Sequence, residues 1–167
     1  MTTQIYEWVK EVKNQYLPQG RLKVLEVGAL DINGSARDHF PDAEYLGTDM
    51  MEGKGVDVVV NGHDIKLPIF KRNSFDVTIC LETFEHDVMF WVTLRNLREV
   101  TKEGGYMLIS TPTFKFPLHR HPQDFYRFGE DAYRELFFRG WDILDLREVV
   151  SKGVNPGIVC IGRKPND

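Results

Sequence analysis

Acidic residues and a glycine follow the apolar segments that the sequence predicts as strands, and they are the residues best placed for chemistry. In an open parallel sheet, ligands bind beyond the carboxyl ends of the strands. Gly28 follows the first such segment, and without a side chain it lets a ligand approach the backbone. Asp49 lies about 20 residues further on, the spacing at which a carboxylate binds ribose hydroxyls. Asp64 is placed to accept from an exocyclic amine such as that of adenine. Together they predict a nucleoside site; a turn glycine and solvated loop acids are the alternative.

The elements that must position these residues alternate between strand and helix patterns. Apolar residues spaced by three and four predict a helix over about 5–16, which Thr2 or Thr3 can cap. Further helices are expected at 36–40, about 88–102 and about 129–139. Gly104 and Gly105 should end the 88–102 helix. Strands are expected at 22–27, 44–48, 56–60, 74–81, 106–110, 141–150 and 158–162. This alternation predicts an α/β fold, a mostly parallel sheet with helices on both faces. Free amides at the start of the 36–40 helix are expected to attract a carboxylate or phosphate.

The end of the chain narrows the topology further. Residues 151–157 alone separate the last two predicted strands. A parallel crossover needs a dozen or more residues, so these strands must form an antiparallel hairpin. A parallel sheet finished by one antiparallel strand counts against the fully parallel dinucleotide-binding fold.

Length and composition bound the class of protein. The 167 residues predict a single domain over 1–167. Hydrophobic residues make up 42% and charged residues 28%, which excludes a disordered tail, a fibre and a membrane protein. The net charge of −4 gives no reason to expect nucleic acid as a partner. Two cysteines cannot make a disulfide framework, and the first residues lack a secretory signal pattern. We therefore expect a cytoplasmic protein that does not bind membranes.

Several segments, in this order and spacing, resemble the successive motifs of class I S-adenosylmethionine-dependent methyltransferases. They are Val24-Leu-Glu-Val-Gly28, Tyr45-Leu-Gly-Thr-Asp49, His63-Asp64, the run from Phe75 to His86, and Gly104-Gly-Tyr-Met-Leu-Ile-Ser110. The terminal hairpin matches the reversed last strand of that family. The resemblance implies a Rossmann-like three-layer sandwich around a seven-stranded sheet of order 3-2-1-4-5-7-6, with the last strand antiparallel. It also implies an enzyme whose cofactor is S-adenosylmethionine.

The resemblance assigns residues to each part of that cofactor. Those expected around it are Glu26, Gly28, Ala29 and Gly34 for the methionine moiety, Asp49 for the ribose, Met50, His63, Asp64 and Ile65 for the adenine, and Leu81 and Glu82 for the sulfonium. One departure is that Leu30 and Ile32 stand where the family commonly has small residues. The loop after Gly28 should therefore take a different path, and a dinucleotide's pyrophosphate would miss its closely spaced glycines.

The acceptor side is expected around two segments. His86 and Glu82 are the candidate catalytic residues: the histidine as a base, or as a residue that fixes the loop, and Glu82 also as a partner for the cofactor's charged end. The irregular, aromatic segment 111–128 should wall the acceptor site. Its candidate substrate-binding residues are His121, Asp124, Tyr126 and Arg127, the last of which pairs with Asp124 or binds an anion. His119 and His121 are one His-x-His pair without a third ligand nearby in sequence, so no metal is expected.

The predicted function is methyl transfer to a small-molecule acceptor. No inserted cap domain is evident, so an exposed site, or a homodimer that completes it, would be consistent with this chain. Two rival functions are open at this point. One is a non-catalytic S-adenosylmethionine-binding module or partner subunit, and the other is an NAD(P)-dependent reductase, which the glycine spacing and the final hairpin oppose.

Overall fold

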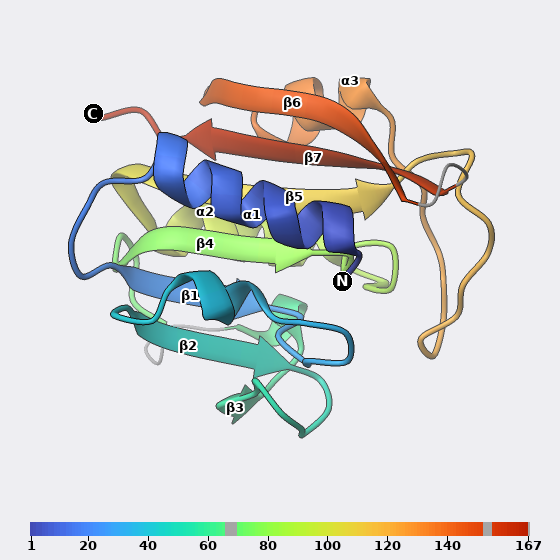
Figure 1. Ribbon diagram of the computed structural model, residues 1–167, viewed down its shortest axis with the longest axis horizontal. Helices are drawn as coiled ribbons and strands as arrows, with labels where there is room; N and C mark the ends of the chain where they lie inside the picture. Colours follow the sequence, from blue (N-terminus) through green and yellow to red (C-terminus); the bar gives the residue numbers. More distant parts are fainter. Residues whose placement is uncertain (66–69, 152–154, 167) are drawn as a thin grey trace.

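A seven-stranded sheet forms the middle layer of the computed structural model, which describes residues 1–65, 70–151 and 155–166 (Figure 1). Its strands are β1 (Lys23–Val27), β2 (Glu44–Asp49), β3 (Val58–Val59), β4 (Phe75–Leu81), β5 (Thr101–Pro112), β6 (Asp142–Ser151) and β7 (Asn155–Arg163). The strand order is β3-β2-β1-β4-β5-β7-β6. The first five strands run parallel, and β7 is antiparallel to both of its neighbours. The predicted fold class, strand order and terminal hairpin are confirmed.

Helices cover both faces of this sheet. In Figure 1, α1 (Thr3–Gln15) lies in front of the sheet and α2 (Phe90–Val100) behind it. The side chain of Thr2 caps α1 by accepting from the Ile5 amide. One core cluster packs between α1 and the sheet around Trp8 and Val9, and the other packs between α2 and the sheet around Leu97 and Phe84. The two clusters explain why the central strands are apolar on both faces.

Three helix predictions need correction. The α2 helix ends at Val100, and β5 begins directly at Thr101, whose buried hydroxyl bonds Thr78 on β4. Gly104 and Gly105 therefore lie inside β5, where its register with β4 shifts, and they do not end the helix. The 36–40 helix is a single 3₁₀ turn, Ala36–His39. The 129–139 helix is a short α3 (Glu130–Ala132) that continues as a π turn, Tyr133–Phe137. That π turn places the buried Tyr133 hydroxyl 3.0 Å from the Ile158 carbonyl on β7.

The strand register brings the ends of three strands together. On β1, Val27 pairs with Thr48 of β2 on one side and Cys80 of β4 on the other. The next residue of each strand therefore emerges at the same edge of the sheet, and β1 is where the chain turns from one half of the sheet to the other. Ligands bind at such a switch point in open α/β sheets.

No helix within the described ranges is both long and apolar enough to cross a membrane. The two cysteines, Cys80 and Cys160, are buried and free.

Candidate functional site

The turn after β1 is fixed by its backbone and has no room for a side chain. The amides of Gly28 and Ala29 both donate to the Thr48 carbonyl, at 2.8 and 3.0 Å. Gly28 has a φ of +83°, and a Cβ built there would lie 2.0 Å from the Oγ1 of Thr83. Thr83 was not among the predicted site residues, although it packs directly on this turn. The glycine therefore forms a cradle that any larger residue would fill.

The loop after Gly28 takes a path that the sequence did not reveal. The Leu30 amide donates to Asp49, and the Asp31 amide to the Lys54 carbonyl. The Asp31 carboxylate binds the Lys54 ammonium at 2.6 Å and accepts from the Gly34 amide at 2.9 Å. These three loop amides are thus used within the protein, and the helix that follows is one short turn. A pyrophosphate finds no cradle among these three amides. At the start of the short helix itself, the Arg37 amide donates to the Ser35 hydroxyl at 3.2 Å. The expectation that free amides at this helix start attract a carboxylate or phosphate stays a prediction.

Asp49 keeps the hydrogen-bonding capacity that a ribose needs. Its two carboxylate oxygens each accept one amide, from Leu30 at 3.3 Å and from Met51 at 3.0 Å. An ionised carboxylate has about four acceptor positions, so about two remain for a pair of hydroxyls. The Asp49 side chain is half-buried at the carboxyl end of β2, and the exposed Met50 follows it. These acceptor positions fit the ribose hydroxyls of S-adenosylmethionine.

Glu26 lies beside this edge but bonds within the protein. Its carboxylate is buried on the same face as Val24 and accepts from the Tyr45 hydroxyl at 2.7 Å. Burial raises the pKa of Glu26 from 4.5 to about 7. The Glu26 side chain therefore faces Tyr45, and contact with the methionine moiety stays a prediction.

Glu26→Gln should stabilise the protein at alkaline pH. With its pKa raised, Glu26 holds a proton in the folded state that the unfolded chain loses above pH 4.5, so its ionisation lowers stability as the pH rises towards 7. Glutamine accepts the same Tyr45 bond without a charge. We expect a gain of about 3 kcal/mol in the free energy of unfolding at pH 8 and almost none at pH 4. Urea denaturation at both values measures this; a variant less stable than the wild type at pH 8 would show that the buried charge is not destabilising.

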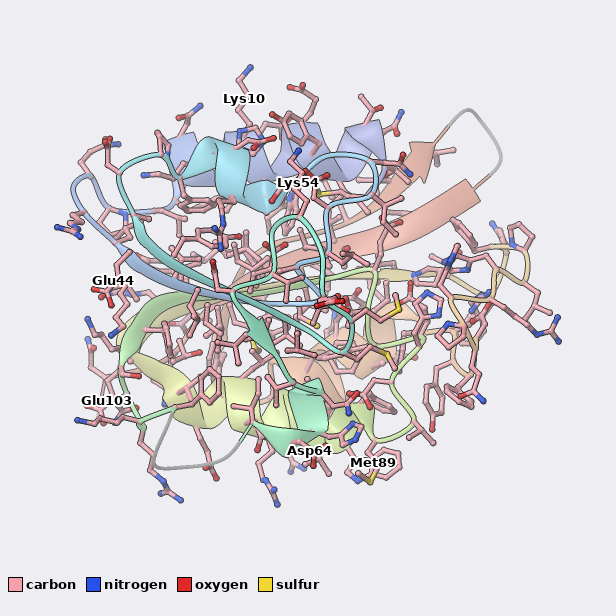
Figure 2. The ribbon with its side chains drawn as sticks, turned by 90° about the horizontal axis from the view of Figure 1, so that it is seen from below. Lys10, Glu44, Lys54, Asp64, Met89 and Glu103 are labelled. Atoms are coloured by element: carbon pink, nitrogen blue, oxygen red, sulfur yellow. The ribbon has the colours of Figure 1, made fainter. Side chains whose placement is uncertain are left out.

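Of the four residues predicted around the adenine, Ile65 is buried, His63 is paired, and Met50 and Asp64 are exposed. Ile65 packs in the core cluster under α2. The His63 Nδ1 lies 2.8 Å from the Asp87 carboxylate, which ties this segment to the start of α2. Asp64 is exposed, and Figure 2 places it on the same side of the sheet as Met89, while Lys54 lies on the α1 side. The segment that leads to Asp64 leaves the sheet beside Asp49, because β3 runs parallel to β2 and the Val60 amide bonds the Asp49 carbonyl.

Glu82 begins the loop after β4 in a strained conformation. Its φ of +48° is unusual for a residue with a side chain, and its amide donates to the Ser110 carbonyl at 2.9 Å. The Glu82 carboxylate accepts from the Thr2 amide at 3.1 Å and lies 3.6 Å from the Met1 amino group. Leu81, just before it, is buried. The first two residues of the chain thus contact the Glu82 carboxylate, which was predicted to lie near the sulfonium of the cofactor.

The predicted acceptor residues chiefly hold their own loop in place. Arg127 binds the Asp124 carboxylate and donates to the carbonyls of Phe116, Tyr126 and Pro117. The Arg127 guanidinium holds the pKa of Asp124 well below its usual range. The Tyr126 hydroxyl donates to the Val88 carbonyl at 3.1 Å. Of the two interpretations of Arg127, the structure favours pairing with Asp124.

The same loop brings histidines to the end of β4. The Phe125 amide donates to the Glu85 carbonyl at 2.7 Å, and this bond joins the two loops. The imidazole of His86 then lies near those of His119 and His121, with ring centroids 4.8 and 6.0 Å away. Glu85 is fully buried beside them, and burial raises its pKa to about 8. Glu85 was not predicted as a site residue; only its position next to His86 pointed to it.

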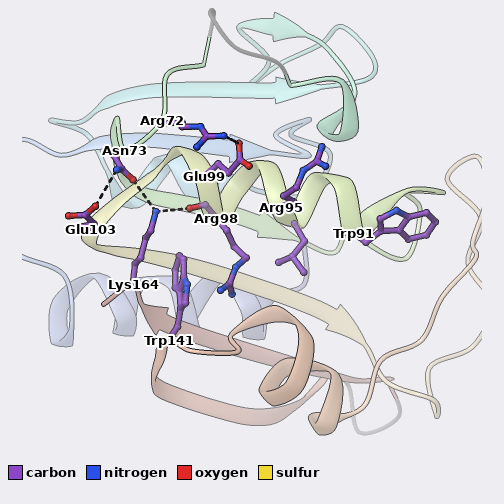
Figure 3. A pocket seen from close by; sticks show the side chains of 10 residues that line it. Arg72, Asn73, Trp91, Arg95, Arg98, Glu99, Glu103, Trp141 and Lys164 are labelled. Atoms are coloured by element: carbon purple, nitrogen blue, oxygen red, sulfur yellow. Dashed lines mark hydrogen bonds and ion pairs between the residues drawn. The ribbon is translucent and has the colours of Figure 1, made fainter. Parts of the chain in front are cut away.

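A large cavity lies elsewhere on the molecule (Figure 3). Its volume is about 490 Å³, and the residues around it include Trp91, Arg98, Trp141 and Lys164. It also touches Asn73, just before β4, so it lies towards the amino ends of the strands. Its position on α2, away from the edge described above, separates it from the predicted site.

Comparison with known proteins agrees with this geometry. Residues 21–109, more than half of the chain, match the model of a family described as "Methyltransferase domain". No curated protein matches.

Solved structures share the fold at low sequence identity. The 1,6-didemethyltoxoflavin-N1-methyltransferase of Burkholderia thailandensis, solved with S-adenosylhomocysteine, is 18% identical with a TM-score of 0.75, covering 96% of this chain and 78% of its own. The N-methyltransferase NodS of Bradyrhizobium japonicum is 11% identical with a TM-score of 0.70, covering 98% and 99%. The [4+2]-cyclase SpnF is 15% identical with a TM-score of 0.72, covering 97% and 81%. By the family match and the fold together, this chain belongs to the class I S-adenosylmethionine-dependent methyltransferases.

Proposed function

We propose that this protein transfers the methyl group of S-adenosylmethionine to a small-molecule acceptor. The observation that supports this most is the meeting of Gly28, Asp49 and Leu81 at one edge of the sheet, next to the loop that carries His86. The alternative of a non-catalytic module is weakened by that loop, because a binding module has no need of ionisable side chains beside its ligand's reactive end.

The cofactor would lie across the ends of β1, β2 and β4. Asp49 would hold the ribose hydroxyls, Met50 and Asp64 would flank the adenine, and the turn at Gly28 and Ala29 would border the methionine end. When bound, S-adenosylmethionine supplies a methyl carbon activated by positively charged sulfur. The protein's task is then to hold the acceptor in line with that carbon, and such positioning supplies about 7–11 kcal/mol.

The acceptor would enter between the loop after β4 and the segment 113–129. The bond from the acceptor atom to the methyl carbon forms as the sulfur–carbon bond breaks, and the bonding electron pair stays on sulfur. A hydroxyl or amine acceptor also loses a proton, which His86 would receive as a base. Three apolar side chains on the segment are exposed, Phe114, Leu118 and Phe125. They favour an acceptor with an apolar part, and a homodimer that covers them also remains a prediction.

Turnover is tested by following S-adenosylhomocysteine release with a panel of small alcohols, amines and activated carbon acids. We expect release with at least one acceptor of the panel, and its loss in Asp49→Ala. Asp42→Ala, an exposed aspartate before β2, is the matched control and should leave release unchanged. Tight cofactor binding without release for any acceptor would favour the non-catalytic module instead.

A further inference from the structure

A cluster of two histidines and one glutamate lies where the two acceptor loops meet. Glu85 and His86 come from the loop after β4, and His119 comes from the segment 113–129. The nearest possible ligand atoms of the three side chains all lie within 4.8 Å of one another. The Nε2 atoms of His86 and His119 are each 3.7 Å from the same carboxylate oxygen, Oε1 of Glu85. Three ligand atoms thus converge on one point.

The Glu85 carboxylate is the unusual member of this cluster. Its side chain has no exposure to solvent, yet neither oxygen accepts a hydrogen bond from another residue within the described parts of the chain. Buried carboxylates in proteins are normally hydrogen-bonded, paired or bound to a metal, because desolvation without a partner is costly. Arg127, a nearby cation, already binds Asp124 and three carbonyls. The carboxylate therefore points to a cation that would lie between it and the imidazoles.

The outer nitrogens of both histidines face acceptors. The Nδ1 of His86 is 2.5 Å from the Gln123 carbonyl oxygen, so it carries the proton and leaves the Nε2 lone pair facing Glu85. Histidines that ligate metals almost always have such a carbonyl or carboxylate behind them, since it fixes the tautomer and orients the ring. The Nδ1 of His119 lies 3.4 Å from the Asp124 carboxylate, which Arg127 holds in place, but it makes no hydrogen bond within the described parts of the chain.

We propose that Glu85, His86 and His119 bind a divalent transition-metal ion. Two imidazole nitrogens and one carboxylate oxygen suit Zn²⁺ or Fe²⁺, whereas Mg²⁺ and Ca²⁺ prefer oxygen ligands throughout. Bonds of about 2.0–2.1 Å place tetrahedral ligand atoms about 3.4 Å apart, so the side chains must close by at most about 1.4 Å. This revises the expectation of no metal. That expectation was based only on the pair His119 and His121, because nothing in the sequence indicated that Glu85 lies next to them.

Three protein ligands leave at least one position open at the metal. Resting on the proposed function, this position would take a hydroxyl oxygen of the acceptor, which the metal would make more acidic. The hydroxyl would then lose its proton to water, its oxygen would keep a lone pair for attack on the methyl carbon, and His86 would serve as a ligand in place of a base. The acceptor class favoured is thus a small molecule with a metal-binding hydroxyl.

Calorimetric titration of Zn²⁺ into the chelator-treated chain, free of any added histidine tag, tests the site. We expect one ion per chain with a Kd of about 1 μM or tighter, and weakening by more than about 100-fold in both Glu85→Gln and His119→Gln. His39→Gln is the matched control, since this histidine packs on Tyr6 of α1, and it should bind as the wild type does. Failure of the wild type to bind, or unchanged binding in both variants, would overturn the proposal.

A second variant and a second ligand distinguish failure of the metal site from failure of the proposed function. If Glu85→Gln fails to fold, His119→Gln decides alone, because the His119 side chain is partly exposed and its loss leaves the core intact. Titration of S-adenosylhomocysteine into the same samples reports on the proposed function independently of the metal. Zn²⁺ binding without cofactor binding would contradict methyl transfer and leave the metal site standing. Turnover that is unchanged after metal removal would overturn the role of the metal towards the acceptor.

Discussion

Gly28→Ala is expected to weaken S-adenosylhomocysteine binding at least 100-fold and to lower the free energy of unfolding by about 2–4 kcal/mol. Two effects add at this position. A side chain at a φ of +83° costs about 1–2 kcal/mol, and the new Cβ would lie 2.0 Å from the Thr83 Oγ1. Thr83 cannot turn away without cost, because its hydroxyl donates to the Leu81 carbonyl at 2.9 Å. The turn must therefore move, and with it the edge that binds the cofactor. Calorimetry and urea denaturation measure the two losses.

A matched control separates the backbone effect from the contact. Gly140 has a similar φ of +76°, and a Cβ there would meet nothing within 4 Å. Gly140→Ala should thus lose about 1–2 kcal/mol and bind the cofactor normally. Adding Thr83→Ala to Gly28→Ala should recover part of the stability, since it removes the Oγ1. Equal losses at the two glycines, with no recovery, would show that Thr83 does not close the cradle.

Asp124→Asn is expected to destabilise the protein by about 3 kcal/mol at pH 7. The Asp124 side chain is almost fully buried, and its loss of charge leaves the Arg127 guanidinium without its carboxylate partner. Because the pKa of Asp124 is lowered in the folded state, its contribution is present above the ordinary value of 3.8 and is lost as the pH falls below it. The difference between variant and wild type should therefore shrink in acid. Urea denaturation from pH 7 down to pH 3 follows it.

An exposed pair on the same chain gives the comparison. Glu130 and Arg134 form an ion pair with both side chains about half exposed. Glu130→Gln should lose less than about 1 kcal/mol, because solvent screens such pairs. If Asp124→Asn cost no more than this control, the buried pair would not be what holds the 113–129 segment on the loop after β4.

The strands and the terminal hairpin could be predicted because they depend on short-range features, whereas the strand order followed from the resemblance to the methyltransferase family. Apolar runs mark the strands, and the gap between the last two is too short for a parallel crossover. The ends of the helices were harder to predict from the sequence. Gly104 and Gly105 read as a helix stop, yet β5 starts at Thr101 because its hydroxyl finds a buried partner in Thr78 on another strand. That long-range contact overrides the local signal of the glycines.

The site was predictable where its residues follow strands and hidden where they meet across loops. Gly28 and Asp49 lie at the ends of neighbouring strands, so the parallel pattern alone brings them together. Glu85 and His119 are joined by the bond between Phe125 and Glu85, which depends on how an irregular loop folds back. No periodicity encodes such a path. The internal pairing of loop amides with Asp31 and Lys54 was hidden for the same reason.

The central claim is that Asp49 and its neighbours on the sheet edge bind the nucleoside of the cofactor. Calorimetric titration of S-adenosylhomocysteine into the wild type, Asp49→Asn and Asp49→Ala tests it most directly. We predict one site per chain, with affinity at least tenfold weaker in Asp49→Ala, about 1.4 kcal/mol, and an intermediate loss in Asp49→Asn. Equal affinity in all three proteins, or no binding by the wild type, would contradict it.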